Sequence, residues 1–115
     1  MSAEFFDCLQ HKHAYVAIAE FKPGRFADAQ RLYEKAISTY KDGFKGAFLL
    51  RKPNSEEGIA VILWKTLEDM EAHQTEVHRK ILEEMGPLFN APPVTNIYEV
   101  CSEVAAYCRD LQPVG

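Results

Sequence analysis

The spacing of apolar side chains changes several times along this chain, and each change marks a predicted element. Residues 13–21 are rich in aromatic and β-branched side chains and are followed by a Pro-Gly pair, which predicts a strand and its end. From 25 to 40, apolar side chains recur at helical spacing, which predicts an amphipathic helix with Tyr40 in its core-facing stripe. Gly43 predicts the end of this helix, because glycine readily adopts the left-handed conformation of a C-terminal cap.

A hairpin and a second helix follow. Residues 44–51 and 58–64 are predicted strands joined by a short polar turn, so they are expected to pair antiparallel. The second helix is predicted to begin at Thr66, where the sequence resembles a capping box. It is predicted to end at Gly86, where glycine is followed directly by proline.

The last part of the chain completes a repeated strand-helix-strand order. Residues 94–100 alternate as a fourth strand, and 102–111 are expected to form a short amphipathic helix in a tail over 101–115. The order is therefore β-α-β-β-α-β in a single α+β domain, 1–115, with its core over 13–100. Right-handed crossovers fold this order into a ferredoxin-like, four-stranded antiparallel sheet with both helices on one face.

The predicted strands are more apolar than helices on one face would require. A half-covered strand should alternate apolar and polar side chains, yet 59–64, 15–19 and 47–50 are apolar throughout. Monomers rarely expose a contiguous apolar patch of more than a few hundred Å². We therefore expect a second copy to cover the open face, sheet against sheet, in a two-fold homodimer. The alternative is a lone domain whose C-terminal tail covers this face.

Charge and cysteine content narrow the class of protein. The 115 residues carry a formal net charge of −4 and show no basic stripe, which argues against a nucleic-acid partner. The longest apolar run, 59–64, is too short to span a membrane, and the acidic N-terminus lacks the basic region of a signal peptide. Cys8, Cys101 and Cys108 cannot all pair within the chain, which fits a reducing, cytoplasmic setting and leaves their roles open.

Trp64, His73 and His78 form the densest group of chemically capable side chains. Trp64 closes the third predicted strand, and the two histidines lie on opposite margins of the second helix's apolar stripe, His78 nearer the sheet. Their spacing does not suit a shared metal ion, which favours an i, i+4 pair. An aromatic wall beside an imidazole suits a flat aromatic ligand, and histidine accepts protons near neutral pH. The alternative is that Trp64 and His78 are ordinary core residues.

In these features the chain resembles the antibiotic biosynthesis monooxygenase family of dimeric α+β barrels. The resemblance covers 13–100 and rests on the element order, the Gly-Phe-Lys-Gly sequence from Gly43, and the Trp64…His73…His78 spacing. It implies a homodimer with a ligand cavity between sheet and helices in each subunit. Characterised relatives oxidise polycyclic phenols or quinols with O₂ and use no metal, flavin or haem. The resemblance also implies that Trp64 is a cavity wall and that both histidines are cavity-side or rim groups.

The implied chemistry assigns roles to further residues. A phenolate can give O₂ one electron without a cofactor, so the protein needs a proton acceptor, a flat apolar slot and a donor for the anion. We expect His78 to be the proton acceptor, with His73 as second choice. The expected slot residues are Trp64, Phe48, Ile18 and Met70. The expected hydrogen-bond donors are Tyr15, Tyr98 or Asn96. Strand parity, which the sequence leaves open, decides which of these face the cavity.

Two alternatives remain open at this stage. The same homodimer could bind a small apolar ligand without turnover, or serve a stress-related role. A haem-binding or haem-degrading relative is the other, because one branch of the superfamily combines a first-strand Asn, the strand Trp and a helix His that ligates iron. Here the first strand has no Asn, and His73 and His78 bracket the position of that ligand.

Overall fold

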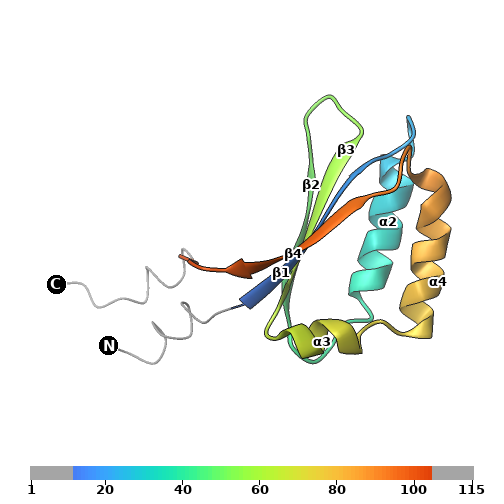
Figure 1. The fold of residues 1–115 in the computed structure, drawn as a ribbon. Helices are drawn as coiled ribbons and strands as arrows, with labels where there is room; N and C mark the ends of the chain where they lie inside the picture. Colours follow the sequence, from blue (N-terminus) through green and yellow to red (C-terminus); the bar gives the residue numbers. More distant parts are fainter. Residues whose placement is uncertain (1–11, 105–115) are drawn as a thin grey trace.

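A four-stranded antiparallel sheet forms one layer of the molecule, and helices pack against one of its faces (Figure 1). The computed structural model describes residues 12–104. Its strands, in chain order, are β1 (Lys12–Glu20), β2 (Phe44–Arg51), β3 (Glu57–Trp64) and β4 (Val94–Val100). They lie in the order β2-β3-β1-β4 across the sheet. This confirms the predicted β-α-β-β-α-β order and the antiparallel hairpin of β2 and β3.

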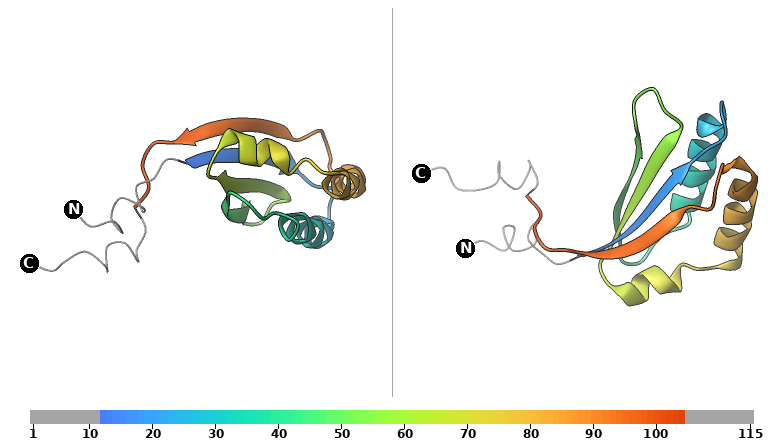
Figure 2. Two further views of the ribbon diagram at one scale, coloured as in Figure 1. Left: turned by 90° about the horizontal axis from the view of Figure 1, so that it is seen from below. Right: turned by 45° about the horizontal axis from the view of Figure 1, so that its top comes forward.

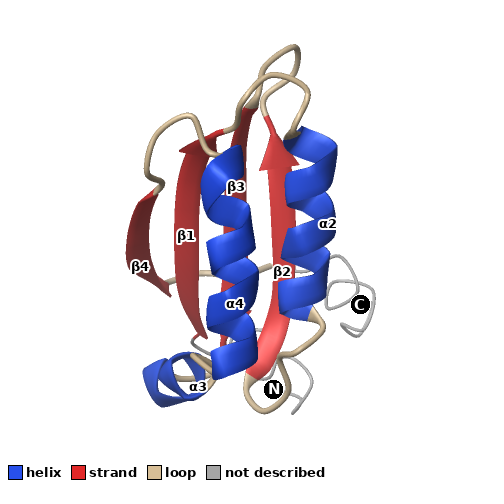
Figure 3. Cartoon of the chain, turned by 90° about the vertical axis from the view of Figure 1, so that its right-hand side faces the viewer, coloured by secondary structure: helices blue, strands red, loops and turns tan. Residues whose placement is uncertain are grey.

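Two helices run side by side over part of the sheet. They are α2 (Phe26–Ile37) and α4 (Glu76–Met85), and they pack on each other (Figure 2). Both lie in front of the β2–β3 side of the sheet, whereas β4 is left uncovered (Figure 3). The 3₁₀ helix η1 (Gly86–Leu88) ends α4, as the Gly-Pro sequence predicts. No helix within residues 12–104 is long and apolar enough to cross a bilayer.

The second predicted helix is two helices, which corrects the sequence interpretation. α3 (Leu67–Ala72) lies across the end of the sheet, and α4 starts again after a break (Figure 1). Each helix has its own threonine cap: the Thr66 hydroxyl accepts from the Asp69 N–H at 3.0 Å, and the Thr75 hydroxyl accepts from the His78 N–H at 3.2 Å. Because a threonine hydroxyl competes well for the first free N–H groups of a helix, Thr75 begins a new helix.

Strand pairing defines the two faces of the sheet. Tyr15 lies opposite Ile62 on β3 and Ile97 on β4, and these side chains share the helix face. Val16, one position on, lies opposite Val61 and Asn96 on the other face. This outer face comprises Ala14, Val16, Ile18, Phe48, Leu50, Ile59, Val61, Leu63, Val94, Asn96 and Tyr98. Its side chains are apolar apart from one asparagine, as the uninterrupted apolar strands predict.

Two separate clusters of buried side chains lie on the helix face. One gathers Phe21, Phe26, Ala29 and Leu88 beside η1. The other gathers Ile62, Trp64 and Met70 beside α3. The expected tail helix over 102–111 falls largely outside the described residues, as do Cys8 and Cys108.

Candidate functional site

A cavity of about 1010 Å³ lies between the helix face of the sheet and the pair α2 and α4. Its floor is lined by small residues, Ala17, Ala19, Gly58 and Ala60, on the two central strands. The large core side chains lie beside η1 and beside α3, where they keep the helices apart from the sheet. The small side chains between these two clusters leave the space open. The volume is at the upper end of the range typical of small-molecule sites.

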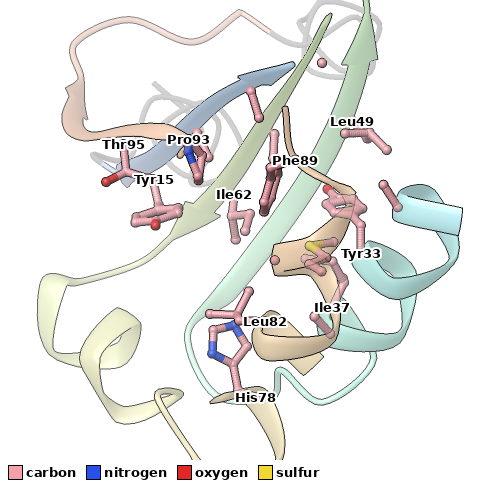
Figure 4. A pocket seen from close by; sticks show the side chains of 18 of the residues that line it. Tyr15, Tyr33, Ile37, Leu49, Ile62, His78, Leu82, Phe89, Pro93 and Thr95 are labelled. Atoms are coloured by element: carbon pink, nitrogen blue, oxygen red, sulfur yellow. The ribbon is translucent and has the colours of Figure 1, made fainter. Parts of the chain in front are cut away.

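Side chains from both the sheet and the helices form the cavity wall, and most of them are apolar. Figure 4 shows side chains from the sheet, from α2 and from α4 around one space: Tyr15, Ile62 and Thr95, then Tyr33 and Ile37, then His78 and Leu82. Phe89 and Pro93, from the segment that follows η1, complete the labelled wall. A flat, largely apolar molecule is the ligand that such a wall fits.

A short polar contact in the cavity joins Tyr40 and His78. The Tyr40 hydroxyl and His78 Nε2 are 2.7 Å apart. Burial, reinforced by the neighbouring Tyr15 and Tyr33, raises the pKa of Tyr40 to about 12, so its hydroxyl keeps its proton. Burial, and secondly the nearby His73, lowers the pKa of His78 below its usual value, so its ring is neutral at pH 7. In the tautomer with its proton on Nδ1, His78 offers the Nε2 lone pair to the Tyr40 hydroxyl.

His73 has a different environment, because both of its ring nitrogens meet backbone groups. Its Nε2 accepts the Lys41 N–H at 3.0 Å, and its Nδ1 lies 2.7 Å from the Asp69 carbonyl oxygen. A backbone N–H can only donate and a carbonyl can only accept, so Nδ1 carries the proton. His73 thereby links α3 to the turn between α2 and β2.

An aromatic cluster fixes the ring of Tyr40 just beyond the end of α2. Its centroid lies 4.9 Å from that of Trp64 and 5.6 Å from that of Phe44. The His73 ring packs edge-on against Tyr40 at 5.6 Å and lies 4.7 Å from Trp64. Trp64 itself is only 2% exposed. These contacts leave the Tyr40 hydroxyl directed at His78.

Five of the sequence-predicted site residues meet at this cavity. Its lining includes Trp64, Met70, Tyr15, His73 and His78. The break between α3 and α4 explains how the two histidines converge, since on one continuous helix they would face different directions.

The other four predicted residues are placed elsewhere, which corrects their expected roles in this cavity. Ile18, Phe48, Asn96 and Tyr98 lie on the outer face of the sheet. Side chains alternate along a strand, so the neighbour of a cavity-lining residue on the same strand points away from the cavity. Three of these are large apolar side chains and are at least 41% exposed.

Sequence reasoning missed two tyrosines. The sequence interpretation places Tyr40 in the core-facing stripe of the first helix and gives Tyr33 no role in a site, yet both line the cavity. The Tyr33 hydroxyl is buried with no hydrogen-bond partner among the described residues, and burial raises its pKa to about 12. The available signal was the residue type, because a buried tyrosine generally needs a partner for its hydroxyl, whereas phenylalanine does not.

Within the described residues, no three His, Cys, Asp or Glu side chains gather closely enough to hold a metal ion. A haem iron would need an imidazole nitrogen with a free lone pair. The Nε2 atoms of both cavity histidines are already hydrogen-bonded, to Tyr40 and to the Lys41 N–H. Iron ligation by either ring would therefore first break a hydrogen bond.

Solved structures share this fold. A proposed antibiotic biosynthesis monooxygenase from Bordetella bronchiseptica aligns with a TM-score of 0.66 at 21% identity, over 77% of this chain and 96% of that chain. Another from Caulobacter crescentus aligns with a TM-score of 0.69 at 18% identity, over 77% and 89%. SnoaB, a cofactor-independent oxygenase from Streptomyces nogalater, aligns with a TM-score of 0.66 at 11% identity, over 83% and 96%. No protein-family model and no curated protein matches the sequence. The chain has the fold of the antibiotic biosynthesis monooxygenases, as the sequence resemblance predicts.

Proposed function

We propose that this chain is a cofactor-independent monooxygenase that oxidises a small phenolic or quinol compound with O₂. The observation that carries the proposal is a neutral, half-buried His78 at the wall of a large apolar cavity. The fold it shares with a cofactor-independent oxygenase supports the same reaction type, although fold alone does not determine function.

The cavity offers the parts that such a reaction needs. His78, kept neutral by its surroundings, is the proton acceptor, and the apolar wall with Trp64 is the slot for a flat ring. Exclusion of water strengthens every hydrogen bond made to the phenolate. His73 serves as a fixed wall group, because backbone partners hold both of its nitrogens.

The reaction balances without an added cofactor. His78 takes the phenol proton, and the phenolate gives one electron to O₂. The resulting phenoxyl radical and superoxide combine, and the imidazolium returns the proton to form a hydroperoxide. Loss of water then gives a quinone. One atom of O₂ becomes the new carbonyl oxygen, and the other leaves as water with two hydrogens from the substrate.

The protein is proposed to act as a homodimer in the cytoplasm. A second copy would cover the outer face, where Phe48 is 59% and Leu50 50% exposed in the single chain. Two such sheets stacked face to face form the barrel expected from the sequence. The alternative cover, the C-terminal tail, would leave a monomer in solution.

Oxygen uptake by the purified protein tests the proposal. 1-Naphthol and an anthrone, the keto form of a phenol, are supplied with a metal chelator present, and quinone formation is followed. His78→Ala should lower turnover by at least about a hundredfold, because a general base contributes that much or more. Lys80→Ala, on the exposed side of the same helix, should leave turnover unchanged. Equal turnover in wild type and His78→Ala would remove His78 as the base.

A binding protein without turnover is the second candidate. The hydrogen bond from Tyr40 favours it, because this bond already occupies the nitrogen of His78 that would accept a proton. In that case aromatic ligands should quench Trp64 fluorescence on binding, while O₂ is not consumed with any quinol.

A further inference from the structure

In the tautomer with its proton on Nδ1, the lone pair of His78 Nε2 is not open to the cavity. The Tyr40 hydroxyl holds it at 2.7 Å. A phenolic ligand in this cavity would therefore find the base already hydrogen-bonded. To be deprotonated by His78, the ligand must either displace Tyr40 or pass its proton through it.

Displacement is opposed by the packing of Tyr40. Its ring is packed against Trp64, Phe44 and His73, with centroids between 4.9 and 5.6 Å away. His73 is in turn tied to Asp69 and to the Lys41 N–H, the residue next to Tyr40. A side chain held on this many sides keeps one orientation, so its hydroxyl stays on His78.

Titratable groups approach the Tyr40–His78 pair from several elements. His73 approaches His78 from the end of α3, and Tyr15 and Tyr33 approach Tyr40 from β1 and α2. At the cavity rim on α4, Arg79 is paired with Glu76 at 2.8 Å. No described group among these supplies a free carboxylate to the pair, so the proton balance concerns Tyr40 and His78 alone.

Building on the proposed function, we infer that Tyr40 is a catalytic proton relay, which contacts the substrate hydroxyl and passes a proton to His78. The substrate O–H bond breaks as its proton moves to the Tyr40 oxygen, while the Tyr40 O–H bond breaks as its proton moves to His78 Nε2. The products are a phenolate, an unchanged tyrosine and an imidazolium. The new Tyr40 O–H then points at the phenolate and stabilises it, which supplies the anion donor that the reaction needs.

A tyrosine with a raised pKa suits this role. Burial holds the pKa of Tyr40 near 12, so it does not remain ionised and cannot replace His78 as the base. It can only transmit a proton whose final acceptor is His78. Removal of either member should therefore break the same pathway.

Bound 4-nitrophenol tests the relay without any oxidation, because its phenolate absorbs visible light and its neutral form does not. At one pH unit below the probe's own pKa, the wild-type protein should bind it as phenolate. Tyr40→Phe, which keeps the ring and removes the hydroxyl, should bind it as neutral phenol, and so should His78→Ala. Tyr98→Phe, the same change on the outer face, should ionise the probe as wild type does. Ionisation retained by Tyr40→Phe, or absent at saturating probe in wild type, would overturn the relay.

Two further measurements separate this inference from the proposed function and from a folding defect. In wild-type protein, ¹⁵N NMR should place the His78 proton on Nδ1 with a hydrogen-bonded Nε2, and the opposite tautomer would contradict the relay. With an active quinol, Tyr40→Phe should lower kcat about a hundredfold with little change in KM, and the double variant with His78→Ala should be no slower. Losses that multiply would indicate independent roles. If the wild type ionises 4-nitrophenol yet no quinol consumes O₂, the proposed oxidation fails while the relay stands.

Discussion

Tyr40 and His78 are 38 positions apart in the chain, yet their side chains meet at 2.7 Å across the cavity. Three local features bring them together: the end of α2 at Ile37, the link of His73 to the Lys41 N–H, and the new helix start at Thr75. None of these lies in the strands that define the fold. The site is thus built by the connections, on a scaffold that the strands provide.

Stability should fall as the medium is acidified through the range of histidine titration. The pKa of His78 is lowered in the folded protein below its ordinary 6.5. Between the two pKa values, the unfolded chain therefore binds a proton at His78 more strongly than the folded chain does. The stabilising contribution is therefore complete above about pH 6.5 and is lost as pH falls through the lowered folded-state value. Urea unfolding between pH 7.5 and 5 measures it. His78→Gln should flatten this part of the curve, and an identical slope in the variant would contradict the assignment.

Filling the cavity floor should block ligand binding without harming the fold. Ala60→Leu places a larger side chain into the open volume above β3. We expect stability to stay level or rise, and affinity for 1-naphthol, followed by Trp64 fluorescence, to fall at least about tenfold. Ala27→Leu, on the exposed side of α2, is the matched control. If the space were closely packed instead, Ala60→Leu would destabilise the protein by about 1–3 kcal/mol.

Gly43→Ala should be more costly than Gly24→Ala. Both glycines have left-handed backbones, with φ of +78° and +77°, so each substitution carries about 1–2 kcal/mol of backbone strain. A Cβ at Gly43 would also collide with the Asp69 side chain, whereas nothing lies within 4 Å of one at Gly24. Urea unfolding should show an extra loss of about 1–3 kcal/mol for Gly43→Ala. Equal losses would mean that Asp69 moves aside freely.

Charge on the outer face should separate the proposed dimer. Phe48→Glu puts a carboxylate on the edge strand β2, within the apolar surface that a second copy would cover. Light scattering should find a dimer for the wild type and a 13.1 kDa monomer for the variant. Val77→Glu, at an exposed apolar position on α4, should remain dimeric. A wild type that is itself monomeric at micromolar concentration would exclude the sheet-to-sheet dimer.

Haem is not expected to bind to the wild-type protein. Ligation of iron by His78 or His73 would require loss of the Tyr40 or Lys41 hydrogen bond. We expect no shift of the Soret band when haemin is titrated into the protein. Tyr40→Phe frees His78 Nε2 and provides the sensitive comparison, because a shift that appears only in this variant would identify the hydrogen bond as the barrier. A shift in wild type would restore the haem-binding alternative.

The order of elements along the chain, the hairpin of β2 and β3 and the apolar outer face all follow from the sequence, because periodicity and turn residues are local signals. The positions of Ile18 and Phe48 do not follow, since a shift of one residue in parity exchanges the faces of a strand that is apolar on both. The break before Thr75 was hidden by an apolar stripe that continues through both helices. The contact between Tyr40 and His78 depends on that break, so the sequence placed Tyr40 in the core.

The new helix start at Thr75 interrupts what could be one regular helix, and it brings the two histidines of the site together. Replacing this threonine by a strong helix former such as leucine would encourage one longer, straighter rod from Leu67 to Met85. Such a rod would gain intrachain hydrogen bonds, but it would swing the imidazoles of His73 and His78 apart. Selection for heat tolerance alone would therefore tend to erase the site. A variant library screened for both survival on heating and phenol ionisation should retain a helix-capping residue at this position.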